Sequence, residues 1–174
     1  MVNNRAKQII FRYYEIAAFV IFVAVTAWFY KYSPKGKDEI TAYLTVVGSL
    51  FTFFYFIQKQ QLEELTLFKG LFTDFNKRYD EMNDKVNKIA NAEIKRPLTP
   101  EEKDILDDYF NLCSEEYLFH RKGYIYDEVW VAWSNGMRFF LNKDVRIREY
   151  WLTEKETNSY YGLDILPDKT GEST

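Results

Sequence analysis

The residues best suited to chemistry stand together in one short stretch of this 174-residue chain. The segment NLCSEEYLFHRKG, residues 111–123, contains Cys113 and His120, and each is the only residue of its type in the sequence. Glu116 lies between them. A thiol, an imidazole and a carboxylate are the groups of a cysteine nucleophile with its base, or of a metal site. The question is whether the helix that carries them brings them together.

The spacing of these residues favours a structural role over a catalytic one. Apolar and aromatic side chains recur at intervals of four and three residues, the pattern of the buried face of a helix. The positions are Leu106, Phe110, Cys113, Tyr117 and His120. Seven helical residues separate Cys113 from His120 by about 10.5 Å, whereas a nucleophile and its base must approach to roughly 3 Å. Glu116 and His120, one turn apart, suit a metal ion, but no third ligand stands at the required spacing.

Other signatures of enzymes are also missing from the sequence. It has no phosphate-binding glycine loop and no serine nucleophile elbow. Acidic neighbours such as Asp107–Asp108 and Glu115–Glu116 point about 100° apart on a helix, which is typical of solvated charge rather than of a catalytic pair. We therefore expect no enzymatic activity, no catalytic residue, no metal ion and no cofactor.

Two long uncharged runs stand in the first third of the chain. The run IAAFVIFVAVTAWFY, residues 16–30, spans about 22 Å as a helix, and ITAYLTVVGSLFTFFYFI, residues 40–57, spans about 27 Å. A bilayer core is about 30 Å thick, and the tyrosines and lysine that flank the first run extend it to residues 13–32. The sequence therefore predicts a transmembrane hairpin in lipid, with spans at about 13–32 and 40–57 and the polar turn KYSPKGKDE between them.

Two alternatives to this hairpin have less support in the sequence. A signal peptide requires a small-residue cleavage site after Tyr30, and a second apolar run follows there instead. A soluble hairpin would have to be covered by the residues after Ile57, although both runs are apolar all round.

Charges and cysteine usage predict the orientation and the kind of partner. Three basic residues precede the first run and three lie in residues 58–77, against three in the connecting turn. This excess favours both ends of the chain on the cytoplasmic side of a bacterial inner membrane, and a single cysteine suits a reducing compartment. Residues 97–174 contain nine basic and sixteen acidic residues, a net charge of −7. That charge disfavours direct nucleic-acid binding and suits a basic protein partner.

Residues 58–96 carry an unbroken apolar heptad, here called the heptad stripe. Its positions are Leu65, Phe68, Phe72, Phe75, Tyr79, Met82, Val86 and Ile89. No proline interrupts the segment, so the second apolar run and this stalk are predicted to form one helix from about Ile40 to Ile94. The heptad stripe either packs on the chain's own distal domain or forms a coiled-coil seam between copies of the chain. Its bulky aromatic residues are less suited to a two-stranded seam.

Residues 97–157 are predicted to form a small helical domain. Thr99 and Glu102 make a capping box with Pro100 between them, and the helix that begins there is expected to end near Arg121, before a glycine.

Two further helices are predicted, capped by Asp127 and Asp144. The tail, residues 158–174, loses periodicity and is expected to be loose or to dock as an extended strip. No segment alternates with period two for long enough to require a strand, so the whole chain is predicted to be all-α.

One face of the second apolar run is polar, and we call it the polar stripe. Its residues are Thr41, Thr45, Gly48, Ser49, Thr52 and Tyr55. Apart from the neighbouring serine, they fall within about 80° of arc on a helix. Small and hydroxylated side chains let membrane helices approach closely and bond to one another, so a packing face is predicted. If several hairpins assemble, the same stripe would line a path for water.

The layout and two segments resemble a known bacterial family. The segments are FNKRYDEMNDKV and DYFNLCSEEYLFHRKGYIYDEVWVAWSNGM. The chain, from about Arg5 to Trp151, resembles small two-transmembrane proteins with a helical cytosolic domain of unknown function, which include membrane effectors of retron antiphage systems. In those systems a reverse transcriptase with its DNA–RNA hybrid restrains a toxin that damages the inner membrane once released. The resemblance brings no catalytic residues.

Two functions follow as expectations. The first is an inner-membrane effector of abortive infection that oligomerises and permeabilises or depolarises the membrane, with a reverse transcriptase and its hybrid docking on the acidic domain. The alternative is a membrane-anchored adaptor whose spans only tether a protein-binding helical domain. The polar stripe separates the two, because a tether does not need one.

Overall fold

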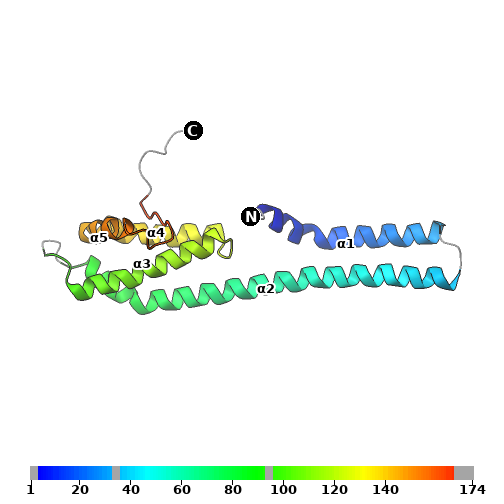
Figure 1. Ribbon diagram of the computed structural model, residues 1–174, viewed down its shortest axis with the longest axis horizontal. Coiled ribbons are helices and arrows are strands. Elements are labelled where there is room, and N and C mark those ends of the chain that lie inside the picture. Colours follow the sequence, from blue (N-terminus) through cyan, green and yellow to red (C-terminus); the bar gives the residue numbers. More distant parts are fainter. Residues whose placement is uncertain (1–3, 33–35, 93–95, 167–174) are drawn as a thin grey trace, which may run out of the picture. The chain divides into compact units, whose positions relative to one another are not determined.

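The computed structural model describes residues 4–32, 36–92 and 96–166. Within these ranges the chain forms five α-helices and no β-strand (Figure 1). The helices are α1 (Asn4–Tyr32), α2 (Lys37–Ala90), α3 (Pro100–Arg121), α4 (Asp127–Lys143) and α5 (Val145–Lys155). The predicted all-α class is confirmed for these residues. Two compact units, Met1–Thr66 and Leu67–Thr174, divide the chain, and α2 contributes to both.

The predicted continuous helix is also confirmed. Because no proline or polar turn interrupts it, α2 runs from the second apolar run straight into the heptad stripe. It ends at Ala90, a few residues earlier than expected, and Ile94 lies outside the described residues.

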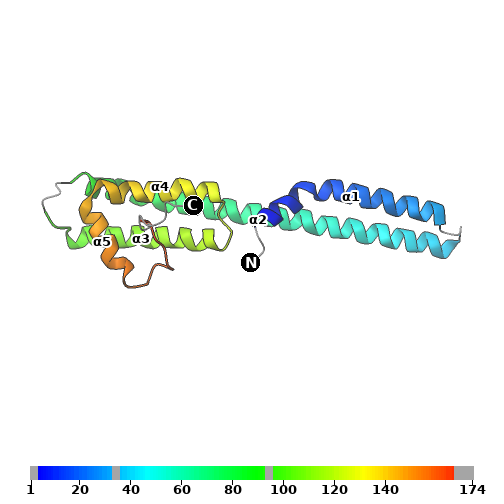
Figure 2. The same ribbon diagram turned by 90° about the horizontal axis from the view of Figure 1, so that it is seen from above.

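In the first unit, α1 lies antiparallel beside the first part of α2 (Figures 1 and 2). The Thr26 hydroxyl is 3.1 Å from the Tyr43 hydroxyl. The Phe29 ring lies edge-on to Tyr43 with centroids 5.1 Å apart, and the Phe22 and Phe51 rings are 6.1 Å apart. These aromatic and hydroxyl contacts hold the two helices together.

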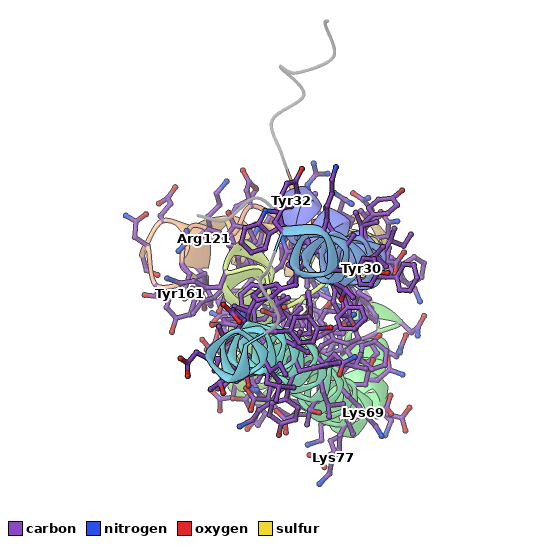
Figure 3. The ribbon with its side chains drawn as sticks, turned by 90° about the vertical axis from the view of Figure 1, so that its right-hand side faces the viewer. Tyr30, Tyr32, Lys69, Lys77, Arg121 and Tyr161 are labelled. Carbon is purple, nitrogen blue, oxygen red and sulfur yellow. The ribbon has the colours of Figure 1, made fainter. Side chains whose placement is uncertain are left out.

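Most of the apolar surface of this unit is exposed. α2 contains an 18-residue stretch that is long and apolar enough to cross a membrane, and none of it is buried. The apolar part of α1, Ile16–Tyr32, is shorter. At its end, Tyr30 and Tyr32 are 92% and 62% exposed (Figure 3). Since exposed apolar surface of this extent is unfavourable in water, the unit is compatible with membrane association.

The second unit is a helical domain with its own core. The end of α2 lies beside α3 and α4, and α5 runs from the end of α4 across to α3 (Figure 2). The core consists chiefly of Val86, Ile89, Leu106, Tyr109, Phe110, Cys113, Met137, Phe140, Leu141, Ile147 and Trp151. Each helix of the unit contributes one apolar face to this core, as amphipathic helices do.

Local capping determines where α3 begins and ends. The predicted capping box is confirmed: Glu102 N–H donates to the Thr99 hydroxyl at 3.3 Å, and Thr99 N–H donates to the Glu102 carboxylate at 2.9 Å. The Arg96 guanidinium also binds this carboxylate and lowers the pKa of Glu102 to about 2. The helix ends at Arg121 as expected, and Gly123 follows with a φ of 82°, which favours glycine.

The two predicted aspartate caps differ in outcome. Asp144 caps α5, because its carboxylate accepts from Arg146 N–H at 2.8 Å. The prediction for Asp127 was wrong: α4 begins at that residue, and Tyr126 is its N-cap without a side-chain hydrogen bond. The Asp127 carboxylate instead lies 3.0 Å from His120 Nε2, across the turn between α3 and α4.

The described part of the tail docks on the domain. Tyr160, Leu163 and Ile165 are buried in the core although they belong to no helix. Arg121, at the end of α3, donates to the Tyr161 carbonyl at 3.0 Å (Figure 3). The described strip therefore docks as expected, but it is bent by turns rather than extended, with positive φ at Asn158 and Tyr161. Residues 167–174 lie outside the described part.

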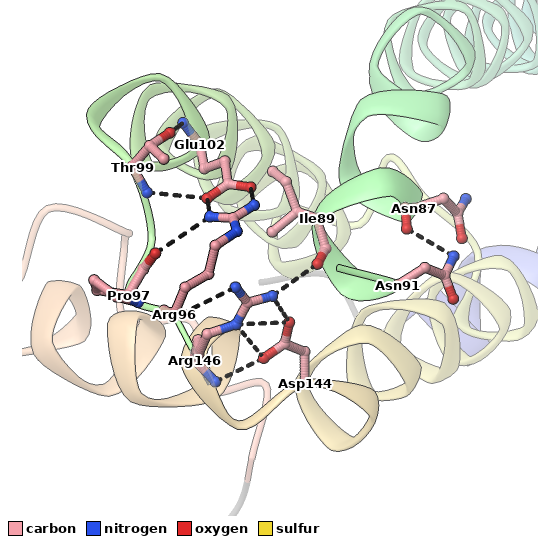
Figure 4. A network of polar contacts seen from close by, with 9 residues as sticks. All are labelled: Asn87, Ile89, Asn91, Arg96, Pro97, Thr99, Glu102, Asp144 and Arg146. Atoms are coloured by element: carbon pink, nitrogen blue, oxygen red, sulfur yellow. Dashed lines mark hydrogen bonds and ion pairs between the residues drawn. The ribbon is translucent and has the colours of Figure 1, made fainter. Parts of the chain in front are cut away.

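A buried ion pair joins α5 to the end of α2 (Figure 4). Asp144 and Arg146 are 0% and 8% exposed. The Arg146 guanidinium donates to the Ile89 carbonyl at 2.9 Å and to the Arg96 carbonyl at 3.3 Å. A helix end leaves carbonyl groups without intrahelical partners, and Arg146 satisfies one of them at the end of α2.

Candidate functional site

The polar stripe lies on an exposed face of α2 that points away from α1. All six of its residues, Thr41, Thr45, Gly48, Ser49, Thr52 and Tyr55, are exposed. The residues two positions after Thr41, Thr45, Gly48 and Thr52 are partly buried. They are Tyr43, Val47, Leu50 and Phe54. Within that set Tyr43 contacts α1. Two residues correspond to about 200° around a helix, so packing against α1 leaves the polar stripe on the outer side.

Hydroxyl groups of the polar stripe bond to their own helix. Thr45 donates to the Thr41 carbonyl at 2.8 Å, Ser49 to the Thr45 carbonyl at 2.8 Å, and Thr52 to the Gly48 carbonyl at 2.9 Å. These bonds satisfy the hydroxyl donors without a partner helix. Each hydroxyl oxygen keeps acceptor capacity, so the stripe tolerates an apolar surrounding and still offers acceptors to water or to a neighbouring helix.

A shallow groove runs along this face of α2. It is lined by Leu44, Thr45, Gly48, Ser49, Thr52, Phe53 and Phe56. A Cβ placed on Gly48 would meet no atom within 4 Å. Small residues allow helix backbones to approach closely in membranes, and no described atom obstructs such an approach at Gly48.

The heptad stripe is covered within the chain at most of its positions. Phe75, Val86 and Ile89 are buried in the helical domain. Phe68, Tyr79 and Met82 are partly buried against the same core. Leu65 is 53% exposed and Phe72 is 39% exposed. The stripe is thus mainly an intramolecular packing surface in this structure, with two of its eight residues exposed.

We expect Phe75→Leu and Phe72→Leu to have unequal effects on stability. Phe75 is 2% exposed and meets Phe119 and Trp133 edge-on, so the smaller side chain should lower the free energy of unfolding by about 1–2 kcal/mol. Phe72 stacks on Trp133 at the surface. Phe72→Leu should therefore lower the free energy of unfolding by about half as much or less. Urea unfolding of the full chain in detergent, followed by tryptophan fluorescence, measures both. Equal losses would show that the heptad stripe is not buried at Phe75.

Cys113 and His120 have different partners. Cys113 is 1% exposed, and its thiol lies in hydrogen-bonding reach of Tyr109. Burial and the nearby Glu116 carboxylate raise the pKa of Cys113 well above its usual range, so the thiol stays protonated and is a poor nucleophile. His120 stacks on Trp130 and pairs with Asp127. No contact among the described residues joins Cys113 to His120.

Glu115 and Glu116 are not equivalent, and the expectation that both are solvated charge is wrong for Glu116. Glu115 is partly exposed and accepts two hydrogen bonds from Arg78, at 2.6 and 3.2 Å. Glu116 is 6% exposed. Burial raises its pKa to about 8, an effect that Arg78 opposes and Glu115 reinforces. Its position three residues after Cys113, on the apolar face of α3, is the sequence signal for this burial.

Glu116 lines a cavity between α2, α3 and α4. The cavity has a volume of about 210 Å³. Its walls are Asn76 and Tyr79 from α2, Tyr109, Leu112, Cys113 and Glu116 from α3, and Ala132, Trp133, Gly136 and Met137 from α4. The cavity is partly open to solvent at Ala132 and Gly136, which are exposed, and it brings open space next to a carboxyl group whose pKa is strongly raised.

The molecule thus offers two candidate sites, the polar stripe on α2 and the cavity at Glu116. Comparison of the chain with protein-family models, with curated proteins and with solved structures finds no match.

Proposed function

We propose that this chain is a membrane effector. Its apolar hairpin crosses a bacterial inner membrane twice with both ends in the cytoplasm. Several copies associate through the polar stripe of α2, and the assembly permeabilises or depolarises the membrane. The observation that carries the proposal is the position of the polar stripe, which is exposed and turned away from α1 on the otherwise apolar residues 40–57 of α2.

The physical argument starts from the lipid environment. A single hairpin would present the hydroxyl oxygens and Gly48 to hydrocarbon, where they gain nothing. Self-association would pack the groove of one copy against the next and place the small residues at the interface. In a ring, the same hydroxyl oxygens would supply acceptors for water.

The resemblance described above supplies the context of this proposal. It favours an abortive-infection system in which a partner holds the effector inactive, and a reverse transcriptase with its DNA–RNA hybrid is the partner that it implies. The charge of residues 97–174, nine basic against sixteen acidic, suits docking of a basic protein. Expression of the chain without a partner should then release its activity.

A membrane-anchored adaptor is the second candidate. The internal hydrogen bonds of Thr45, Ser49 and Thr52 favour it, because they make the polar stripe stable without any assembly. In that case the helical domain alone would carry the function, and the hairpin would serve as a tether.

The test replaces two hydroxyls of the polar stripe. Thr45→Leu with Thr52→Leu should abolish loss of membrane potential when the chain is expressed alone in bacteria, because leucine removes two acceptors and adds bulk on both sides of Gly48. Leucine preserves insertion, since it is favourable in a membrane span. A voltage-sensitive dye reports the potential at matched amounts of protein in the membrane.

The matched control is Val23→Leu with Val46→Leu. Each of these changes also adds one heavy atom to an exposed position of the hairpin, and neither removes a hydroxyl. The control should depolarise cells like the unmodified chain. If the unmodified chain leaves the potential and growth normal, the effector proposal is wrong and the adaptor is favoured. If both double variants change the membrane potential equally, the polar stripe is only a packing surface.

A further inference from the structure

The cavity at Glu116 has the size of a small organic ligand. At about 210 Å³ it exceeds a cavity that holds benzene, which measures roughly 150 Å³. It remains below the range of drug-sized pockets, which begins at roughly 300 Å³. A molecule of about ten heavy atoms or fewer would fill it. All of its walls belong to the helical domain, so this site is independent of the polar stripe and of the proposed membrane activity.

Glu116 has no partner that explains its position. Only 6% of the surface of this residue is exposed. Within the described part of the chain, no hydrogen bond or ion pair holds its carboxyl group. Arg78, the cation that lowers its pKa, is engaged by Glu115 at 2.6 Å and by Asp74 at 3.9 Å. Its carboxyl oxygens keep some accessible surface, because in the described part of the chain Trp151 Nε1 is the fully buried side-chain polar atom without a partner. They therefore face the open space of the cavity, which a partner could occupy.

The walls around Glu116 favour a positive charge on an apolar stem. Tyr79, Tyr109 and Trp133 present aromatic rings, whose faces attract cations. Trp133 is held in place by stacking on Phe72, with centroids 5.8 Å apart. The Asn76 amide donates to the Phe72 carbonyl at 2.7 Å, which leaves its amide oxygen as an acceptor.

We infer that this cavity binds a small free primary amine, whose ammonium group pairs with the Glu116 carboxylate while its apolar stem lies against Leu112, Trp133 and Met137. The ammonium group donates three hydrogen bonds, and Glu116 and Asn76 supply acceptors for them. An anion would be repelled by the carboxylate. A neutral apolar molecule would leave the carboxyl group without a partner.

Binding should release a proton. Burial raises the pKa of Glu116 to about 8, so its carboxyl group is largely protonated at pH 7, and an ammonium ion stabilises the ionised form. Arg78 on α2 lowers this pKa and Glu115 on α3 raises it. Tyr79, Tyr109 and Cys113 have raised pKa values and stay neutral. The wall from α4 carries no titratable side chain. The affinity for an amine should therefore rise several-fold between pH 7 and pH 8.

In the experiment, benzylamine is titrated into the full chain in detergent micelles, and isothermal titration calorimetry measures the binding. We expect saturable binding of one benzylamine per chain, and at least tenfold weaker binding of benzyl alcohol, which has the same size without the charge. Heats measured in buffers of different ionisation enthalpy report the released proton. Absence of saturable benzylamine binding, or equal binding of benzyl alcohol, would overturn the assignment.

Two variants distinguish the contribution of the Glu116 charge to binding from that of the cavity volume. Glu116→Gln keeps the shape and removes the charge, and it should weaken benzylamine binding at least tenfold. Gly136→Leu should fill the cavity, because a Cβ at Gly136 meets no atom within 4 Å, and it should weaken both benzylamine and benzyl alcohol. Cooperative thermal unfolding of each variant without ligand verifies its fold. Unchanged binding by folded Glu116→Gln overturns the inference.

A last comparison identifies the source of the amine. n-Butylamine should bind the unmodified chain, whereas Nα-acetyl-lysine methylamide, which attaches the same stem to a backbone, should bind at least tenfold more weakly. Equal binding of the two would overturn the choice of a free amine and assign the site to a lysine side chain of a partner protein.

Discussion

Arg146→Met is expected to lower the free energy of unfolding of the helical domain by about 3–5 kcal/mol. The Arg146 side chain contacts both carboxylate oxygens of Asp144, with nitrogen–oxygen distances of 3.1, 3.2 and 2.5 Å. Methionine keeps much of the apolar stem but leaves a fully buried carboxylate without its cation. It also leaves the Ile89 carbonyl without its donor. Urea unfolding of the full chain in detergent at pH 7, followed by tryptophan fluorescence, measures the loss.

The double variant Asp144→Asn with Arg146→Met is the control for this prediction. Asparagine keeps an oxygen that caps α5, and it carries no charge that needs a cation. Because the cost of the single variant comes mainly from the unpaired buried charge, the double variant should be clearly more stable than Arg146→Met alone. A single variant that loses less than about 1 kcal/mol, or a double variant that is no more stable, would show that the pair contributes little.

The second large effect concerns Glu116 and depends on pH. The folded-state pKa of about 8 lies above the ordinary value of 4.5. Between these two values the folded chain keeps a proton that the unfolded chain has released. The free energy of unfolding should therefore fall as the pH rises from about 4.5 to about 8, and level off above that. At 1.36 kcal/mol per pKa unit, the full effect is on the order of 5 kcal/mol.

Glu116→Gln removes this dependence, because the amide is neutral at every pH. The variant should match the unmodified chain at pH 5 and exceed its free energy of unfolding by on the order of 5 kcal/mol at pH 9. Urea unfolding at several pH values provides the measurement. Glu128→Gln, at an exposed glutamate in the first turn of α4, is the control and should leave the pH dependence unchanged. Parallel pH profiles for Glu116→Gln and the unmodified chain would contradict the burial of this carboxyl group.

Some features of this protein depend on residues close together in the chain, and the sequence by itself determined them. The all-α class follows from helical periodicity and from the absence of alternating segments. The start of α3 follows from Thr99 and Glu102, three residues apart, because their hydrogen bonds are local. The grouping of the polar stripe on one side of α2 follows from 100° of rotation per residue, whatever surrounds the helix.

Other features were decided only by the tertiary structure. Periodicity places Thr45 and Thr52 on one face, but packing of Tyr43 against α1 makes that face the outer one. Asp127 has the residue type of a cap, yet it pairs with His120 across a turn.

The two neighbouring glutamates and the buried arginine show the physical reason for this division. Arg78 reaches Glu115 from 37 residues away, while the packing of α2 and α4 around α3 removes Glu116 from water. Arg146 finds the Ile89 carbonyl across 57 residues. Hydrogen bonds within a helical turn depend on adjacent residues, whereas desolvation of a polar group depends on which distant surfaces cover it, and only the folded chain brings those surfaces together.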